Sequence, residues 1–394
     1  MNGALEYTGL TWDHPRGFEP LDAAARNLVK ENGGLRIQWS KQPLEGFESH
    51  PIESLAEQYD LVVIDHPCLG EVSESKCFFP MEELFPAEEL SGWSKDAVGH
   101  SYESYNYQGK QWALPLDAAA QVCALRADII GRDHGPETWS DVLLLADRYP
   151  VALSLSGPHA LLTFFSICSG IAGSETRPAT DDVFDDHVCV EAYGLLQKLY
   201  EKVVKAYLNE NPIALLDRMS SGDDIALCPL IYGYVNYSMI DRTGERDLIT
   251  FVNAPKISKS HIPGSTIGGT GIAVSRGAKI TQALLDHIRY LMSPHYQIGF
   301  SPDHAGQPSF EKAWRDLKLN EQASQFYLAT LDTLHNAWVR PRYPGYVQFQ
   351  SDGSAMLRAA LAEGLPAEET VRRLKAIYHE SRSIHSKQKE SSHG

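Results

Sequence analysis

The sequence predicts an α/β fold, and three observations support that prediction. Short apolar segments alternate with longer helix-like segments through most of the 394 residues, which is the pattern of sheets with crossover helices. Two of the apolar segments, at 10–12 and 61–64, run directly into the same tripeptide, Asp-His-Pro, at 13–15 and 65–67. Because proline lacks a backbone N–H and biases the preceding residue away from the helix, each tripeptide should end a strand and open a loop.

The first part of the chain contains the elements that lead to these tripeptides. Pro20 lies in the first turn of an expected helix, and Gly33 and Gly34 are expected to end it. The segment before Asp65 is continuously apolar, as in strands that are buried on both faces. In order, we expect a strand at 8–12, a helix from 20, a strand at 35–39, a helix at 51–59, a strand at 59–64 and a hairpin at 106–116 that turns at Gln108 and Gly109.

The rest of the chain alternates in the same way. Thr138 and Asp141 have the spacing of a capping box, and Gly222 follows the end of another helix-like segment. The expected helices are 142–146, 160–171, 188–203, 212–219 and 280–292, and the expected strands are 151–155, 225–230 and 271–274. The C-terminal part should be helical apart from 340–345, and the polar tail 381–394 is expected to be disordered.

Composition argues against several classes of function. The formal net charge of -16 disfavours nucleic acid and anionic membrane surfaces as partners. No apolar segment approaches the roughly 18 residues that span a bilayer, so no membrane insertion is expected. Residues 1–6 show no basic start and no apolar stretch, so we expect no signal peptide in the chain as given. The six cysteines form no C-x-x-C pair, which favours free thiols.

The repeated tripeptide indicates where the function should be sought. In open α/β sheets, ligands bind just outside the carboxyl ends of the strands. Asp13 and Asp65, with His14 and His66 beside them, follow two such ends. Two loops of the same chemistry at one sheet edge predict a shared site.

The order of several segments resembles that of a known family. These segments are 107–115 (YQGKQWALP), 222–227 (GDDIAL) and 268–275 (GGTGIAVS), followed by Ala283, Leu291, Ser293 and Gln297. Taken in order, from about residue 5 to 378, they resemble the family 1 extracellular solute-binding proteins, the carbohydrate-binding receptors of ABC importers. No single segment is as specific as a metal-binding or P-loop signature, and the ordered series carries the resemblance.

This resemblance implies a two-lobed α/β, periplasmic-binding-protein-like fold of type II, with the ligand cleft between the lobes. The first lobe would comprise 1–117 and 267–301, and the second 118–266 and 302–380. Such receptors close about a hinge when ligand binds and perform no catalysis. The resemblance further implies a carbohydrate-like small molecule and an ABC permease as partners, a monomer, and a periplasmic or extracytoplasmic location. A cytoplasmic location stays open because no signal peptide is visible.

The resemblance also suggests which residues would contact the ligand. Sugar hydroxyls bind amide, carboxylate and guanidinium groups, and the C–H face of a sugar ring packs on aromatic side chains. Two arginines on one loop could instead bind an acidic sugar in fork geometry. The candidate ligand-binding residues are Trp12, Asp13, His14, Arg16, Asp65, His66, Asp117, Gln121, Tyr232, Tyr234, Asn236, Tyr237, Gln307, Arg340, Arg342 and Tyr343. No catalytic residue, metal or cofactor is expected.

Other interpretations of the same residues remain open. Asp13 and Asp65 could simply cap the turns that follow them, and the aromatic candidates could be packing groups. With His14 and His66 they could bind zinc or manganese, or the two carboxylates could act as a glycosidase pair. Gly269 and Gly271 lack the third glycine of a dinucleotide site. A cytoplasmic ligand sensor of the same fold is the remaining alternative.

Overall fold

The computed structural model describes residues 5–32, 35–131, 134–174, 178, 182–239 and 248–392. By their contacts, the residues group into two compact units. Unit 1 comprises Met1–Ala118, Gly268–Leu319 and Arg342–Pro344, and unit 2 comprises Ala119–Ile267, Asn320–Pro341 and Gly345–Gly394. Within the described ranges, no helix is both long enough and apolar enough to cross a membrane.

Unit 1 is built on a mainly parallel sheet. Its strands β1 (Leu5–Trp12), β2 (Leu35–Gln42), β3 (Leu61–Ile64) and β9 (Ile267–Val274) lie in the order β2-β1-β3-β9. β1 is parallel to both neighbours, and β9 is antiparallel to β3. The chain thus moves outward from β1 to β2 and then back past β1 to β3. Right-handed crossovers then require the intervening helices to lie on opposite faces of the sheet.

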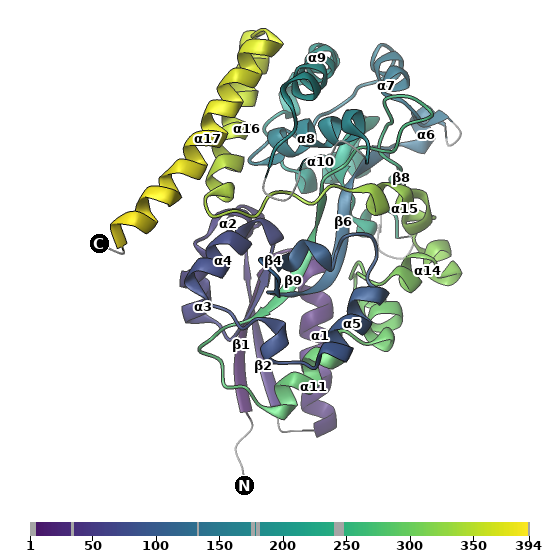
Figure 1. Ribbon diagram of the computed structural model, residues 1–394. Helices are drawn as coiled ribbons and strands as arrows, with labels where there is room; N and C mark the ends of the chain where they lie inside the picture. Colours follow the sequence, from purple (N-terminus) through teal and green to yellow (C-terminus); the bar gives the residue numbers. More distant parts are fainter. Residues whose placement is uncertain are drawn as a thin grey trace. The chain divides into compact units, whose positions relative to one another are not determined.

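Figure 1 shows this arrangement, with α1 (Pro15–Asn32) on one side of β1 and β2 and α3 (Ile52–Gln58) on the other. A two-stranded hairpin, β4 (Asn106–Tyr107) and β5 (Lys110–Gln111), turns at Gln108 and Gly109, whose positive φ values of 51° and 74° suit a tight turn. The other helices that lie in unit 1 or begin there are α2 (Leu44–Ser49), α4 (Leu69–Ser75), α5 (Ala87–Asp96), α11 (Gln282–Leu291), α12 (Ser301–Asp303), α13 (Glu311–Trp314) and α14 (Leu317–Gln322).

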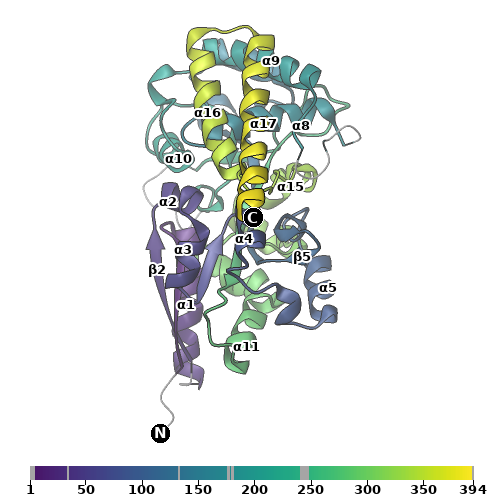
Figure 2. The same cartoon turned by 60° about the vertical axis from the view of Figure 1, so that its left-hand side comes forward.

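Unit 2 combines a small antiparallel sheet with a group of packed helices. β6 (Leu114–Leu125) begins in unit 1, and in unit 2 it pairs with β7 (Leu227–Tyr232) and β8 (Thr250–Val252). Figure 2 shows α16 (Tyr346–Glu363) and α17 (Ala367–Ser392) side by side. The other helices are α6 (Ala127–Ile130), α7 (Trp139–Ala146), α8 (His159–Ala172), α9 (Asp186–Lys202), α10 (Pro212–Ser221) and α15 (Phe326–Asn336). From His159 to Gly170 every side chain of α8 is buried, so this helix forms the core of the group.

Most expected elements are present, and some differ. The predicted ends of β1 and β3, the hairpin and the capping box at Thr138 are confirmed. The predicted strand at 151–155 is wrong, because only Val151 forms a bridge, to Leu227. The first helix begins at Pro15 rather than at Pro20. The expected stop at Gly33 and Gly34 lies outside the described residues.

The C-terminal part differs from the expectation in two places. The tail expected to be disordered continues α17 to Ser392, because residues 367–392 contain neither glycine nor proline to end the helix. Residues from 302 to 319, assigned to the second lobe from the sequence, group with unit 1. The cause is their bonding to the start of β6. Ser309 Oγ donates to Pro115 O (2.7 Å) and Gln307 Nε2 donates to Ala118 O (2.8 Å).

Candidate functional site

The two Asp-His-Pro loops of unit 1 leave the same edge of the sheet. β1 and β3 are parallel neighbours, with Gly9 level with Leu61 and Leu10 level with Val62. Two residues further on, Trp12 is therefore level with Ile64, and the next residue of each strand is an aspartate. The carboxyl ends of parallel strands are the usual place for a ligand in such sheets.

Asp13 and Asp65 have different surroundings at this edge. The Asp13 side chain is 57% exposed and forms an ion pair with Lys41 (2.6 Å between Oδ1 and Nζ). The Asp65 side chain is 20% exposed, and its Oδ1 accepts a hydrogen bond from His66 N (2.8 Å). Asp65 thereby caps the short 3₁₀ helix His66–Cys68, which is the capping role that the sequence left open. Lys41, the ion-pair partner of Asp13, comes from β2 and was not among the residues predicted for the site.

Trp12, His14 and Arg16 form a stacked group behind Asp13. The rings of Trp12 and His14 are parallel within 6° at 5.0 Å, and the Arg16 guanidinium carbon lies 5.1 Å from the centre of the Trp12 ring. Trp12 is only 2% exposed. A Cβ on Gly17 would lie 2.1 Å from Trp12 Nε1, so only glycine at 17 permits this packing. These contacts favour a structural role for the Trp12 ring.

A buried ion pair connects this group to two other strands. Arg16 Nε donates to Asp117 Oδ2 (3.1 Å), and Thr270 N donates to Asp117 Oδ1 (2.7 Å). Both charged side chains are about 5% exposed. Burial raises the pKa of Asp117, and the nearby Arg16 charge opposes that shift. Burial, followed by the Arg16 charge, lowers the pKa of His14 to about 3, so His14 is neutral at pH 7 and its Nδ1 accepts a hydrogen bond from Arg16 N.

His66 and Arg342 belong to the packing of unit 1. The buried His66 ring meets the Tyr105 ring edge-on at 6.2 Å. Arg342 Nη1 donates to the backbone oxygens of residues 103, 104 and 106, at 3.1, 3.2 and 2.8 Å. Tyr343, beside it, is 5% exposed. A Cβ on Gly70 would lie 2.3 Å from Pro344 N, so glycine at 70 allows the 342–344 segment to approach α4.

The two candidate arginines of the late loop, Arg340 and Arg342, lie in different units. Arg340 belongs to unit 2, where its Nη1 donates to Gln350 Oε1 (3.0 Å), and it is 2% exposed. Arg342 belongs to unit 1 and supports the backbone oxygens described above. Their hydrogen bonds give no support to the alternative of a two-arginine fork around one acidic group.

Within unit 2, the candidates range from buried to half-buried. Gln121 is fully buried, accepting from Ser166 Oγ (2.6 Å) and donating to Thr163 Oγ1 (3.3 Å). The Tyr237 hydroxyl donates to Asp217 Oδ1 of α10 (3.0 Å), so the Tyr237 side chain is attached to that helix.

The other three candidates are the last residue of β7, Tyr232, and two residues of the loop that follows it, Tyr234 and Asn236. The Tyr234 ring is 4% exposed and packs edge-on against the Tyr237 ring. Tyr232 and Asn236 are half-buried, so they retain exposed surface for a ligand.

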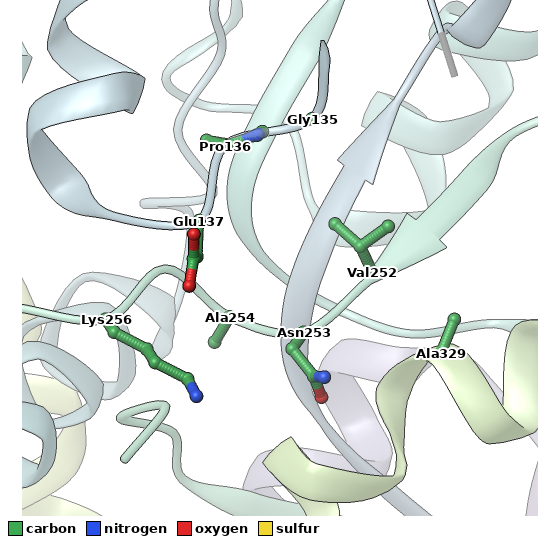
Figure 3. Close-up of a pocket in the computed structure, with 8 residues that line it drawn as sticks. All are labelled: Gly135, Pro136, Glu137, Val252, Asn253, Ala254, Lys256 and Ala329. Carbon is green, nitrogen blue, oxygen red and sulfur yellow. The ribbon is translucent and has the colours of Figure 1, made fainter. Parts of the chain in front are cut away.

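The described residues contain no group of three or more His, Cys, Asp and Glu side chains that could hold a metal ion. Asp13, His14, Asp65 and His66 thus do not form the metal site considered as an alternative. The six cysteines are free thiols. A separate cavity in unit 2, shown in Figure 3, is lined by none of the candidate residues, and no motif in the sequence indicated it.

Comparison with solved structures shows a shared fold. A maltose-bound MalE3 from T. maritima aligns with a TM-score of 0.78 at 16% identity, covering 97% of this chain and 100% of that one. An ABC transporter solute-binding protein from Agrobacterium radiobacter K84, in complex with ribitol, aligns with a TM-score of 0.75 at 18% identity, covering 96% and 98%. A third structure, an ABC transporter solute-binding protein from Agrobacterium vitis S4 with bound D-mannitol, aligns with a TM-score of 0.74 at 15% identity. The alignment covers 98% of this chain and 99% of that one.

These alignments confirm the predicted α/β, two-lobed periplasmic-binding-protein-like fold. No curated protein matches this sequence. Residues 23–318, however, match the profile of the family described as bacterial extracellular solute-binding protein. That match confirms the family resemblance of the sequence, and it agrees with a protein that binds a solute rather than an enzyme. The chain belongs to the family of bacterial extracellular solute-binding proteins.

Proposed function

We propose that this protein binds a neutral sugar or polyol outside the cytoplasm and delivers it to an ABC permease without changing it chemically. The family supplies the general role of solute binding. Three proteins of the same fold are described with maltose, ribitol or D-mannitol, all uncharged polyhydroxylated molecules. The protein acts as a monomer in this proposal.

The observation that carries the proposal is the pair of carboxylates at adjacent strand ends. Asp13 and Asp65 retain exposed side-chain surface at the edge where ligands bind in such sheets. An ionised carboxylate only accepts hydrogen bonds, and each hydroxyl of a sugar or polyol can donate one. The hydrogen bonds of Arg16 and Arg342, in contrast, go to Asp117 and to backbone oxygens, which favours a neutral ligand over an acidic one.

We further propose that Tyr232 and Asn236 of unit 2 contact the ligand, since both retain exposed surface at the end of β7. The other candidates then support the site indirectly. Arg16 and Asp117 hold the loop after β1, Tyr234 and Tyr237 pack together in the loop after β7, and Gln121 connects β6 to α8.

A thermal-unfolding screen tests the proposal. Maltose, ribitol, D-mannitol and a set of sugar acids would each be added to the protein in excess. A ligand present at 100 times its dissociation constant stabilises the folded state by about 2.7 kcal/mol, which is easily measured. We expect a neutral sugar or polyol to stabilise and the sugar acids to have no effect. Stabilisation by the acids alone would contradict the proposal, and so would chemical conversion of a bound sugar.

A further inference from the structure

Unit 2 contains a cavity of about 430 Å³, and none of the candidate ligand-binding residues lines it. This volume lies in the range of about 300–1,000 Å³ that is usual for small-molecule pockets. Three polar side chains line it, Glu137, Asn253 and Lys256, together with an apolar wall that includes Pro136, Val252 and Ala254. In Figure 3 the Lys256 side chain extends toward Asn253, and Ala254 lies in the wall between them.

Backbone hydrogen bonds hold two walls of the cavity together. Lys256 N donates to Glu137 O (2.9 Å), and Trp139 N donates to Lys256 O (3.0 Å). Lys256 and Thr138 thereby form a parallel bridge next to the first turn of α7. Because these bonds involve only backbone atoms, the side chain of Lys256 can be changed without breaking the hydrogen bonds that join the two walls.

Asn253 presents hydrogen-bond donors to the cavity. Its Oδ1 accepts from both Thr333 N (2.9 Å) and Thr333 Oγ1 (2.8 Å). These two donors fix which end of the amide is oxygen, so the nitrogen occupies the other position. Among the residues that the structure describes, none accepts a hydrogen bond from Asn253 Nδ2. Two N–H groups of a fixed amide are therefore available at the cavity wall.

Lys256 adds a positive charge on the same side. Its side chain is 24% exposed, and Nζ forms an ion pair with Asp332 Oδ2 at 3.6 Å, a separation beyond the length of a good hydrogen bond. In the described part of the chain, Nζ has no hydrogen-bond acceptor. Glu137, the acidic group of the wall, is 2.9 Å from Lys259 Nζ at the surface, so its charge is already balanced.

We propose that this cavity is a second ligand site, which binds a small organic carboxylate. A carboxylate is acceptor-only and can receive hydrogen bonds from Lys256 Nζ and Asn253 Nδ2 together, and such charge-assisted bonds are the strong ones. A short aliphatic body fits the wall formed by Val252 and Ala254. The site is independent of sugar binding at the strand ends of unit 1.

Saturation-transfer NMR with butyrate as the probe, on the full chain, tests this proposal. We expect butyrate to receive saturation from the protein and the neutral analogue butyramide to receive much less. In Lys256→Met, butyrate affinity should fall about tenfold or more, since a hydrogen bond to a charged group is lost. Lys198→Met is the matched control, because it removes an exposed lysine of α9 that does not line the cavity, and it should keep butyrate binding.

Asn253→Asp separates binding from folding. The new carboxylate keeps the oxygen that accepts from Thr333, but it replaces the two N–H donors with an acceptor that repels butyrate. We expect a melting temperature near that of the parent and loss of the butyrate signal. The proposal is overturned if butyrate gives no signal with the parent, if Lys256→Met binds as tightly as the parent, or if butyramide binds equally well. Sugar-induced stabilisation should remain in Lys256→Met and in Asn253→Asp. A loss of butyrate binding can therefore be told apart from a failure of the proposed sugar binding.

Discussion

The two Asp-His-Pro tripeptides have the same sequence and the same position after parallel strands, yet different structures follow them. After β1, Pro15 begins an α-helix of 18 residues, and Asp13 pairs with Lys41 in solvent. After β3, Pro67 lies in a 3₁₀ helix of three residues, and Asp65 caps that helix through His66 N. Both histidines are buried, but His14 stacks face-to-face on Trp12 whereas His66 meets the edge of Tyr105.

The difference shows which properties are local. Proline ends the strand in both cases, because its effect needs only the neighbouring residue. The two carboxylates differ in this respect: Asp13 depends on Lys41 from β2, whereas Asp65 depends on the turn of its own chain into the 3₁₀ helix, where it accepts from His66 N. The first loop is therefore the more exposed of the two, and the second is the more tightly bound to its own backbone.

The largest effect is expected from the ion pair that anchors the first loop. Asp117→Ala should lower the free energy of unfolding by about 3–5 kcal/mol, because the Arg16 guanidinium would stay buried without its carboxylate. Urea unfolding followed by circular dichroism measures this loss. Replacing both partners, as Arg16→Met with Asp117→Leu, should restore much of the stability. A loss below about 1 kcal/mol in Asp117→Ala would mean that the loop is held by other contacts.

Ligand affinity should separate the two carboxylates. Asp13→Ala and Asp65→Ala should each weaken binding of the sugar or polyol by about 1.5–3 kcal/mol, with the larger loss for the more exposed Asp13. Calorimetric titration with the ligand identified by the screen measures both. Glu57→Ala, an exposed carboxylate of the same unit on α3, is the control and should bind like the parent. Unchanged affinity in both aspartate variants would assign them a purely structural role.

Acid should destabilise the protein through its buried neutral histidines. Burial lowers the pKa of His14 to about 3 and the pKa of His287 to about 4, against about 6.5 in the unfolded chain. Below pH 6.5 the unfolded chain therefore binds more protons, and stability falls as the pH falls from 6.5 toward 4. Each histidine contributes about 1.4 kcal/mol per pH unit in that range.

Urea unfolding between pH 7 and pH 4.5 measures this slope. His14→Phe keeps an aromatic ring on Trp12 but cannot be protonated, so it should show a shallower slope than the parent. An identical slope in His14→Phe would contradict the assigned burial of His14.

The smallest effect concerns the stability of the two aspartate variants in the absence of ligand. Asp65→Ala should cost about 1 kcal/mol, the usual value for a lost N-cap, whereas Asp13→Ala loses only an exposed ion pair and should cost less than about 0.5 kcal/mol. Equal losses would remove the structural distinction between the two loops.

The sequence predicted those parts of the protein that depend on nearby residues. The ends of β1 and β3, the hairpin turn at Gln108 and Gly109, and the capping box of α7 all follow from short-range chemistry. The partner of Arg16, in contrast, is Asp117, 101 residues away, and nothing near Arg16 indicates it. Arg342 was expected at a ligand, but its guanidinium supports a backbone segment more than 230 residues earlier. The cavity at Asn253 and Lys256 forms from three separate segments, none of which carries a recognisable motif.

The place of β9 in the sheet of unit 1 has a consequence for the order of folding. β9 begins at Ile267 and pairs with β3, which ends at Ile64, so the chain between them must be synthesised before this pairing can form. Until then β3 has an unpaired edge, and exposed strand edges can pair with other chains. Loop closure over some 200 residues also slows the folding of such sheets. A chain emerging from the ribosome would thus remain without a complete unit 1 while most of unit 2 is made, and during that interval it would depend on chaperones or on rapid completion to avoid aggregation.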